Sequence, residues 1–356
     1  MSSPTRTTLS IVFVAGTIAG GCGDPVSLDD GECPAWTRLH GDRCVLRPWL
    51  LPGPDDALGQ PGARDVQVAL GPEGDALVAW SWSATTGEGP VVLAEPAGDG
   101  WSLTEASAGE GSGLEPAVAV SPHGHALLAW KQQRTDGAIH VATRDPDGTW
   151  QWPAAPLSWS ETAYEPRVAF APDGEALVSW NQWTGEHFGV AVATRPAATP
   201  EAPFVAPQSA AELLSPQVNY ANAPRLAIGG DGEALVTWYQ APVDDLMVYV
   251  SERREPGGAF RRPRADDFVS PAGGPVDSHA QANPWPALHP SGAAAVVWTQ
   301  QRRTGDLPVY LALRDPDGTW HRPTSLDDPL SHPGALARCP QAAFAPDGTL
   351  VVTWFE

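Results

Sequence analysis

The sequence predicts an all-β fold, a single β-propeller of six four-stranded blades, because one motif occurs six times along the chain. In each copy a glycine is followed six residues later by a tryptophan and preceded five residues earlier by an alanine. No segment shows helical periodicity, and a repeat of roughly 50 residues is typical of propeller blades. The six glycines are Gly74, Gly124, Gly174, Gly232, Gly292 and Gly348.

Each repeat is expected to supply four strands in order. A short first strand, such as residues 118–121, ends in Pro-Asp-Gly or a variant, and this turn predicts a hairpin because proline presets φ and glycine accepts a positive φ. The second strand, such as residues 126–130, is apolar at nearly every position, which indicates that both of its faces are covered. A third strand and a fourth, which follows the turns at residues 144–150 and 314–320, complete the blade.

The last repeat reaches only its second strand before Glu356. Residues 33–51 contain two short apolar segments around a His-Gly-Asp turn, and we predict that this N-terminal hairpin closes the last blade and removes an open sheet edge. The alternative is a small independent disulfide knob followed by an incomplete blade. In an exported protein, Cys33 and Cys44 are expected to form a disulfide across this hairpin.

The N-terminus has the pattern of an export signal. Arg6 is followed by an apolar run over residues 9–18, too short to span a bilayer, and then by small residues before Cys22. This ending resembles a bacterial lipoprotein signal, which implies lipidation of Cys22; ordinary secretion and an uncleaved anchor are the alternatives. We therefore divide the chain into a signal peptide (1–21), a flexible tether (22–32), the hairpin (33–51), a linker (52–63) and the propeller (64–356).

Composition excludes several functions. A net charge of −21, with Lys131 as the sole lysine, argues against nucleic-acid binding, which depends on cations that contact phosphates. The closest histidines, His123 and His125, lack a third metal ligand, and no phosphate-loop or dinucleotide signature is present. We expect no metal and no cofactor.

The repeated pattern Pro-x-Val-Ala-x-x-Pro-Asp-Gly-x-Ala-Leu-Val-x-Trp, followed by Val-Ala-Thr-Arg and Asp-Gly-Thr-Trp, resembles exported bacterial repeat proteins with a sialidase-like propeller. The resemblance covers most of residues 64–356. It places Asp147-Gly148 and Asp317-Gly318 where that family has an Asp-box, which is degenerate here because aspartate and glycine are adjacent. It implies a fold, and a propeller scaffold hosts many functions.

Two groups of residues are candidate ligand contacts. The first lies two positions after the repeated tryptophans and forms a rim that suits a polar ligand such as a glycan, unless its amides satisfy backbone groups at strand ends. The second contains residue types that sialidase chemistry uses, namely arginines that bind a carboxylate and a Tyr–Glu pair. The default interpretation of each of these side chains is a solvated surface group. The first group is Trp82, Gln132, Gln182, Gln240 and Gln300, with Trp183 nearby; the second is Tyr164, Glu165, Arg167 and Arg225.

These observations predict an exported lipoprotein of the outer membrane or cell surface, with a periplasmic or secreted location as alternatives. We expect a monomer that touches the membrane only through its lipid and uses the propeller as a non-catalytic module for protein or polysaccharide. The alternatives are a glycan-degrading enzyme, that is, a sialidase-like glycosidase or lyase, and an architectural envelope protein. Convergence of charged side chains in one central pocket would favour the enzyme.

Overall fold

The computed structural model describes residues 11–14, 37–40 and 43–46 and most of residues 62–356. The residues not described within the last range are 73–75, 83–88, 98–99, 108–110, 134–136, 161, 242–245, 273–283 and 333. The chain divides into two compact units, one made of Met1–Ala15 and Pro61–Glu356 and the other of Gly16–Gln60.

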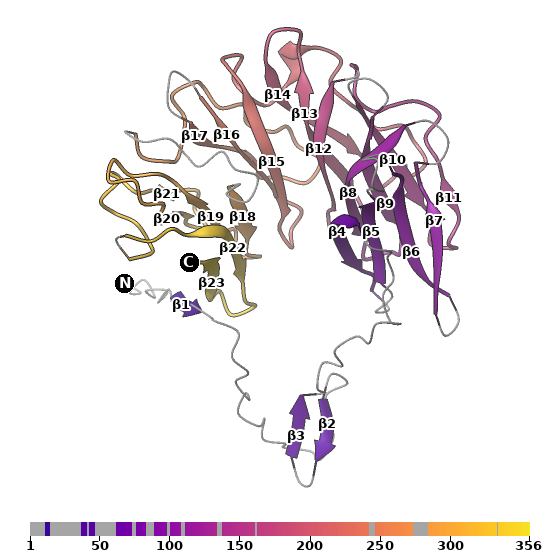
Figure 1. Cartoon of the computed structure of the whole chain (residues 1–356), viewed down its shortest axis with the longest axis horizontal. Helices are drawn as coiled ribbons and strands as arrows, with labels where there is room; N and C mark the ends of the chain where they lie inside the picture. Colours follow the sequence, from indigo (N-terminus) through magenta and orange to yellow (C-terminus); the bar gives the residue numbers. More distant parts are fainter. Residues whose placement is uncertain are drawn as a thin grey trace, which may run out of the picture. The chain divides into compact units, whose positions relative to one another are not determined.

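The larger unit is all-β, as predicted, and its strands pair antiparallel apart from one parallel edge strand in the last sheet. In its described part the helical content is one 3-10 turn, η1 (Ala210–Glu212). Three sheets have four strands paired in chain order (Figure 1). The first contains β4 (Ala63–Leu70), β5 (Ala76–Trp82), β6 (Val91–Ala97) and β7 (Gly100–Glu105). The second contains β8 (Ser112–Val120), β9 (Ala126–Gln133), β10 (Ala138–Arg144) and β11 (Trp150–Gln151). The fifth contains β18 (Trp285–Leu288), β19 (Ala294–Thr299), β20 (Val309–Arg314) and β21 (Trp320–His321).

The third and fourth sheets have three full strands, and a single bridge marks the fourth position. The third contains β12 (Ala163–Phe170), β13 (Ala176–Trp183) and β14 (Phe188–Arg195), with Val205 bridged to Thr194. The fourth contains β15 (Ala221–Ile228), β16 (Ala234–Gln240) and β17 (Met247–Arg253), with Phe268 bridged to Tyr249. The strand order is therefore the predicted one, while the outermost strand is short or irregular.

The hairpin turns form as the sequence predicts. Gly124 has a φ of +83°, its N–H donates to the Ser121 carbonyl at 3.1 Å, and the Ser121 N–H donates to the His125 carbonyl at 2.7 Å. The later repeat glycines also have positive φ, a region that residues with a Cβ rarely adopt. This turn sends the second strand back beside the first.

The apolar cores lie between successive sheets. The cluster around Trp298 joins Val248 and Val250 of the fourth sheet to Val296 and Tyr310 of the fifth. Full burial of such a side chain contributes about 1.5–3 kcal/mol. The first strands β4, β8, β12, β15, β18 and β22 (Arg338–Phe344) contact one another in chain order, so each sheet packs on the next.

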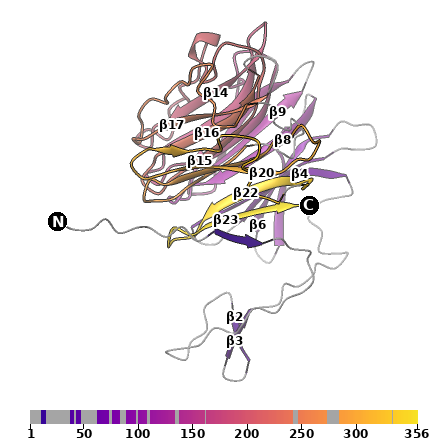
Figure 2. The ribbon, with the colours of Figure 1, turned by 90° about the vertical axis from the view of Figure 1, so that its left-hand side faces the viewer.

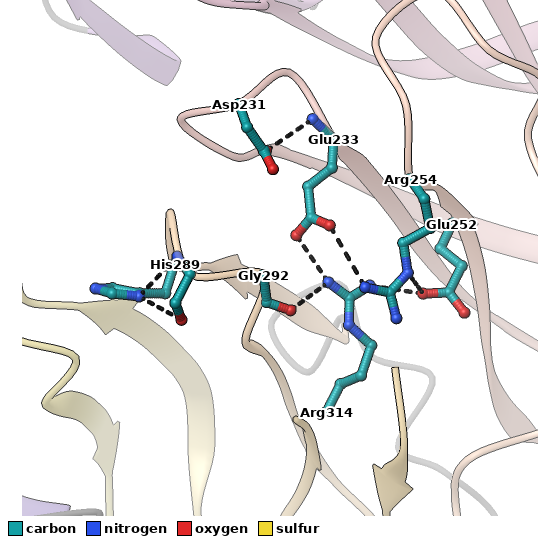
Figure 3. A network of polar contacts seen from close by, with 8 residues as sticks. Asp231, Glu233, Glu252, Arg254, His289, Gly292 and Arg314 are labelled. Atoms are coloured by element: carbon teal, nitrogen blue, oxygen red, sulfur yellow. Dashed lines mark hydrogen bonds and ion pairs between the residues drawn. The ribbon is translucent and has the colours of Figure 1, made fainter. Parts of the chain in front are cut away.

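Arginines at the ends of third strands join neighbouring sheets. Arg314 Nη2 lies 2.7 Å from Glu233 Oε1 and donates to the Gly292 carbonyl at 2.8 Å, while its Nη1 lies 2.6 Å from Glu252 Oε2 (Figure 3). Arg254 also reaches Glu252, with 3.3 Å between Nε and Oε2. These buried, charge-assisted contacts tie β20 of the fifth sheet to the fourth sheet.

Arg253 joins the fourth sheet to the third in the same way, and we call such an inter-sheet arginine contact a clasp. Its Nη1 and Nη2 bind Glu175 Oε1 and Oε2 of the third sheet at 2.8 and 2.7 Å, and its guanidinium lies over the Phe260 ring. Arg144 and Glu95 join the second sheet to the first at 2.8 Å. The arginine that ends the third strand thus joins neighbouring sheets at Arg144, Arg253 and Arg314.

The last sheet has an N-terminal strand at its edge. β22 pairs with β23 (Leu350–Phe355), and β23 pairs in parallel with β1 (Ile11–Val14), as Figure 2 shows. β2 (Thr37–His40) and β3 (Arg43–Leu46) form the expected hairpin but pair with each other in a sheet of their own. Among the described strands the neighbour of β23 is therefore β1, and closure by residues 33–51 stays a prediction.

No helix in the described part of the chain is long and apolar enough to cross a membrane.

Candidate functional site

A repeated backbone irregularity shapes one end of the first strands. The pairing of β4, β8, β12, β15 and β22 with the next strand shifts register near its start, where one non-glycine residue has a positive φ. A proline follows this residue in four of the five strands, and its missing N–H removes a ladder hydrogen bond. The left-handed residues are Asp65, Glu115, Glu165, Ala223 and Cys339, with φ between 51° and 55°, a region that non-glycine residues rarely adopt.

A cavity of about 350 Å³ opens at this end of four successive first strands. Its lining residues are Asp65 and Gln67 of β4, Glu115 and Pro116 of β8, Glu165 and Arg167 of β12, and Arg225 of β15. The structure thus brings together Glu165, Arg167 and Arg225, which the sequence analysis singled out. Convergence of charged side chains in one central pocket is the observation that the sequence analysis gave as favouring a glycan-degrading enzyme over a non-catalytic module.

The two arginines of this cavity have few internal partners. Arg167 Nη1 donates to the Pro166 carbonyl at 2.8 Å, and Arg225 stacks on Trp285 with 5.1 Å between guanidinium and ring centre. Each Nε atom is buried without a hydrogen-bond partner, and within the described residues neither guanidinium has a carboxylate oxygen within 4.0 Å. Burial lowers both pKa values, that of Arg225 to about 10, where the charge of Arg167 adds to the effect. Arginine keeps its charge at neutral pH, so two half-buried guanidiniums with buried Nε atoms face one cavity, and neither has an ion pair among the described residues.

The carboxylates of the cavity are held by other donors. Glu165 Oε2 accepts from Asn181 Nδ2 at 2.8 Å and from the Ala223 N–H at 3.0 Å. Glu115 Oε2 accepts from the Glu165 N–H at 2.5 Å. Burial raises the pKa of Glu115, against the opposing effect of that hydrogen bond. The carboxylates are therefore oriented at fixed positions around the arginines.

Tyr164 lies beside the cavity and is not among its lining residues. Its hydroxyl donates to Asn222 Oδ1, and its ring contacts Phe188 edge-on with 4.7 Å between ring centres. Burial raises the pKa of Tyr164, and the nearby Glu165 adds to this, so the phenol stays neutral. It holds β12 against β15.

The candidate glutamines are engaged inside the protein. Gln182, Gln240 and Gln300 are fully buried, and each accepts from the indole N–H of the tryptophan two residues earlier at 2.9, 3.1 and 3.2 Å. The Nε2 groups donate onward, for example from Gln300 to the Pro271 carbonyl at 2.8 Å. Gln132 accepts from Trp130 in the same way, at 3.0 Å. This geometry favours the alternative that these amides satisfy groups at strand ends.

The remaining predicted residues are dispersed. Trp82 ends β5 and is half-buried, and Trp183 ends β13 within an aromatic cluster. Cys22 and Cys33 and the side chain of Cys44 lie outside the described residues. Cys339 is half-buried in β22. The residues that the structure describes contain no group of three or more His, Cys, Asp or Glu side chains suited to a metal ion.

The sequence analysis missed Asp65, Gln67 and Glu115. A signal for two of them was present, because Asp65, Glu115 and Glu165 all stand nine residues before the repeat glycine. Their identical place in three repeats put them at the same end of the sheets. A second cavity, of about 460 Å³, lies at the opposite ends of these strands and has no ionisable lining residue.

Comparisons with known proteins give no family. No family model and no curated protein matches the chain. Solved structures that it resembles include a protein of unknown function from Dyadobacter fermentans (11% identity, TM-score 0.45, 82% of this chain and 93% of that one). The Trypanosoma rangeli sialidase has 9% identity and a TM-score of 0.46, over 82% of this chain and 52% of its own. A thermostable family-43 glycoside hydrolase has 15% identity and a TM-score of 0.34, over 67% of this chain and 82% of its own. The strand pairing above establishes the all-β architecture, and likeness at this level does not distinguish between functions.

Proposed function

We propose that the larger unit is a binding module for an anionic saccharide, with the carboxylate or sulfate of one sugar held by Arg167 and Arg225. The observation that carries this is the pair of half-buried arginines on one cavity, whose buried Nε atoms have no hydrogen-bond partner. A planar guanidinium suits a bidentate anion, and such an anion would offset the mutual repulsion of the two cations.

The other lining groups favour a sugar over a simple inorganic ion. Asp65, Gln67 and Glu165 offer carboxylate and amide oxygens around the arginines, and oxygens of this kind accept hydrogen bonds from hydroxyl groups. A ligand that carries one negative charge and several hydroxyls matches both parts of the cavity.

The direct experiment is a glycan array probed with the full chain. We expect hits confined to saccharides that carry a carboxylate or sulfate. Hits among neutral glycans alone would contradict the proposal. An array without hits would contradict it too, and would make protein binding or an architectural role the leading alternatives.

Hydrolysis of a glycosidic bond at the same cavity is the second candidate. Burial raises the pKa of Glu115, and the Glu165 carboxylate beside it is oriented by two hydrogen bonds, from Asn181 and from the Ala223 N–H. An acid and a carboxylate in one site are the groups that glycoside hydrolysis uses. Every array hit is therefore assayed for released reducing sugar, and turnover that persists in Glu115→Gln would exclude Glu115 as its proton donor.

For the architecture, we propose a ring of six blades. Val66, Val68 and Leu70 of β4 are 54–70% exposed, although β4 is a first strand like the buried ones, so a neighbouring blade would cover them on ring closure. β1 lies within the predicted signal peptide, and cleavage would vacate its place beside β23 for residues 33–51. Deletion of residues 33–51 should then lower the urea midpoint of the mature chain, and an unchanged midpoint would contradict this closure.

For the cellular context, we propose that Cys22 is lipidated and that the protein is exported to the outer membrane or cell surface. The support is the sequence pattern before Cys22. Cys22→Ser should shift the protein from the membrane fraction to the soluble fraction. Unchanged fractionation would contradict lipidation.

A further inference from the structure

Four aromatic side chains form a platform beside the charged cavity. Trp183 and Phe188 face each other across the β13–β14 hairpin with 4.9 Å between ring centres. Tyr220, just before β15, lies nearly parallel to Trp183 at 6.4 Å, and Tyr164 completes the group through its contact with Phe188. We call Tyr164, Trp183, Phe188 and Tyr220 the aromatic platform.

The platform is a surface feature. Tyr220 is 50% exposed, and the other three rings are half-buried, whereas the repeated tryptophans of the same sheets are fully buried. His187 and Gln217 lie at its rim, with 3.3 Å between His187 Nε2 and Gln217 Oε1. Exposed aromatic faces bordered by polar side chains suit a ligand that has both apolar C–H faces and hydroxyl groups, and a sugar ring has both.

The platform is continuous with the cavity. Tyr164 immediately precedes Glu165, which lines the cavity, and its hydroxyl bonds Asn222 on the segment that also carries Tyr220. The next residue, Ala223, donates its N–H to Glu165. Residues 164–167 and 220–225 therefore carry Glu165, Arg167 and Arg225 of the cavity together with two of the four aromatic rings, Tyr164 and Tyr220.

Lys131 marks the junction between the two. Its Nζ lies 5.9 Å from the centre of the Tyr164 ring, and its charge acts on the cavity residue Glu115. It is the sole lysine of the chain. A ligand that extends from the cavity across Tyr164 would pass this amine.

We propose that the aromatic platform is a second subsite, which binds the sugar ring next to the anionic residue held by Arg167 and Arg225. This inference rests on the proposed function and deepens it, because it makes the ligand an acidic oligosaccharide and not a single acidic sugar. The ring would stack on Trp183 and Tyr220, and Lys131 would lie along its edge.

The test compares matched acidic sugars by calorimetry on the full chain. The probes are N-acetylneuraminic acid with 3′-sialyllactose, and galacturonic acid with trigalacturonate. We expect the oligosaccharide of at least one pair to bind roughly tenfold more tightly than its monosaccharide, the size of one good stacking contact. Tyr220→Ala should remove this advantage and leave the monosaccharide affinity unchanged, while Trp101→Ala, a change at another exposed aromatic on β7, should leave both unchanged.

Acetylation of Lys131 gives a second measurement that needs no substitution. The oligosaccharide should slow acetylation of Lys131 in the wild-type chain more than the monosaccharide does, with the α-amino group as internal reference. Equal affinity for both members of each pair, or equal loss of both in Tyr220→Ala, would overturn the subsite and leave the proposed function standing. Absence of binding by all four probes and by every acidic glycan on the array would overturn the proposed function itself.

Discussion

The clasp between Arg253 and Glu175 allows a quantitative test of how the sheets are held together. Both side chains are buried, at 1% and 6% exposed, and two hydrogen bonds of 2.8 and 2.7 Å join them across the third and fourth sheets. Glu175→Gln keeps the volume of the side chain and removes its charge. It therefore leaves the Arg253 cation buried without a counterion, which costs about 3–5 kcal/mol.

The assay is urea unfolding followed by tryptophan fluorescence. With an m-value of about 3 kcal/mol/M, the midpoint should fall by roughly 1 M or more. The control is Arg261→Met, which breaks a more exposed pair with Asp267 and should cost less than about 1 kcal/mol. The double substitution Glu175→Leu with Arg253→Met should recover most of the loss, because apolar side chains can replace a buried ion pair with little cost. A midpoint for Glu175→Gln that matches Arg261→Met would refute the reasoning.

Three further predictions concern single side chains. Gln300→Leu removes the hydrogen-bond partner of the Trp298 indole N–H and of the Pro271 carbonyl, and it should lower the free energy of unfolding by about 2 kcal/mol or more. The measurement is the urea midpoint, and a change below about 0.5 kcal/mol would contradict the internal role of the amide. Hydrogen bonds from Arg302 lower the pKa of Asp306, so Asp306 stabilises the fold above its unfolded pKa of about 4. The stability lost in Asp306→Asn should thus be full at pH 7 and shrink as pH falls below about 4, and a loss independent of pH would contradict this. Glu115→Gln should strengthen binding of an acidic saccharide at pH 7, because it removes a negative charge from the cavity; weaker binding would show that the carboxylate itself contacts the ligand.

Local chemistry made much of the fold predictable. The turn glycines, the second strands that are apolar throughout and the third strands all follow from rules that act within a few residues, and the described repeats show them where expected. The fourth strand was less predictable, since in the third and fourth sheets it reduces to one bridge at Val205 or Phe268. The strand next to β23 depends on pairing between residues far apart in the chain, which no local pattern specifies.

The candidate site could also be predicted only in part from the sequence. Arg167, Arg225 and Glu165 were found because they are residue types that sialidase chemistry uses and lie at the start of first strands, where successive sheets bring their side chains together. The glutamines two residues after the repeated tryptophans recur in four blades, and their shared role is to bond the buried indoles. The ion pairs of the arginine clasps went unrecognised because each joins a third strand to a residue of the preceding sheet, and only the packed sheets bring the two side chains together.

The measurement that tests the central claim most directly is calorimetry of an acidic saccharide, chosen from the array, on the wild-type chain, Arg225→Met and Arg167→Met. Loss of a charge-assisted contact should weaken binding between about tenfold and a hundredfold in each variant, whereas Arg261→Met, which removes the same charge from an exposed site, should leave the affinity within about twofold. Unchanged affinity in both cavity variants, or an equal loss in Arg261→Met, would contradict a site built on the guanidiniums of Arg167 and Arg225.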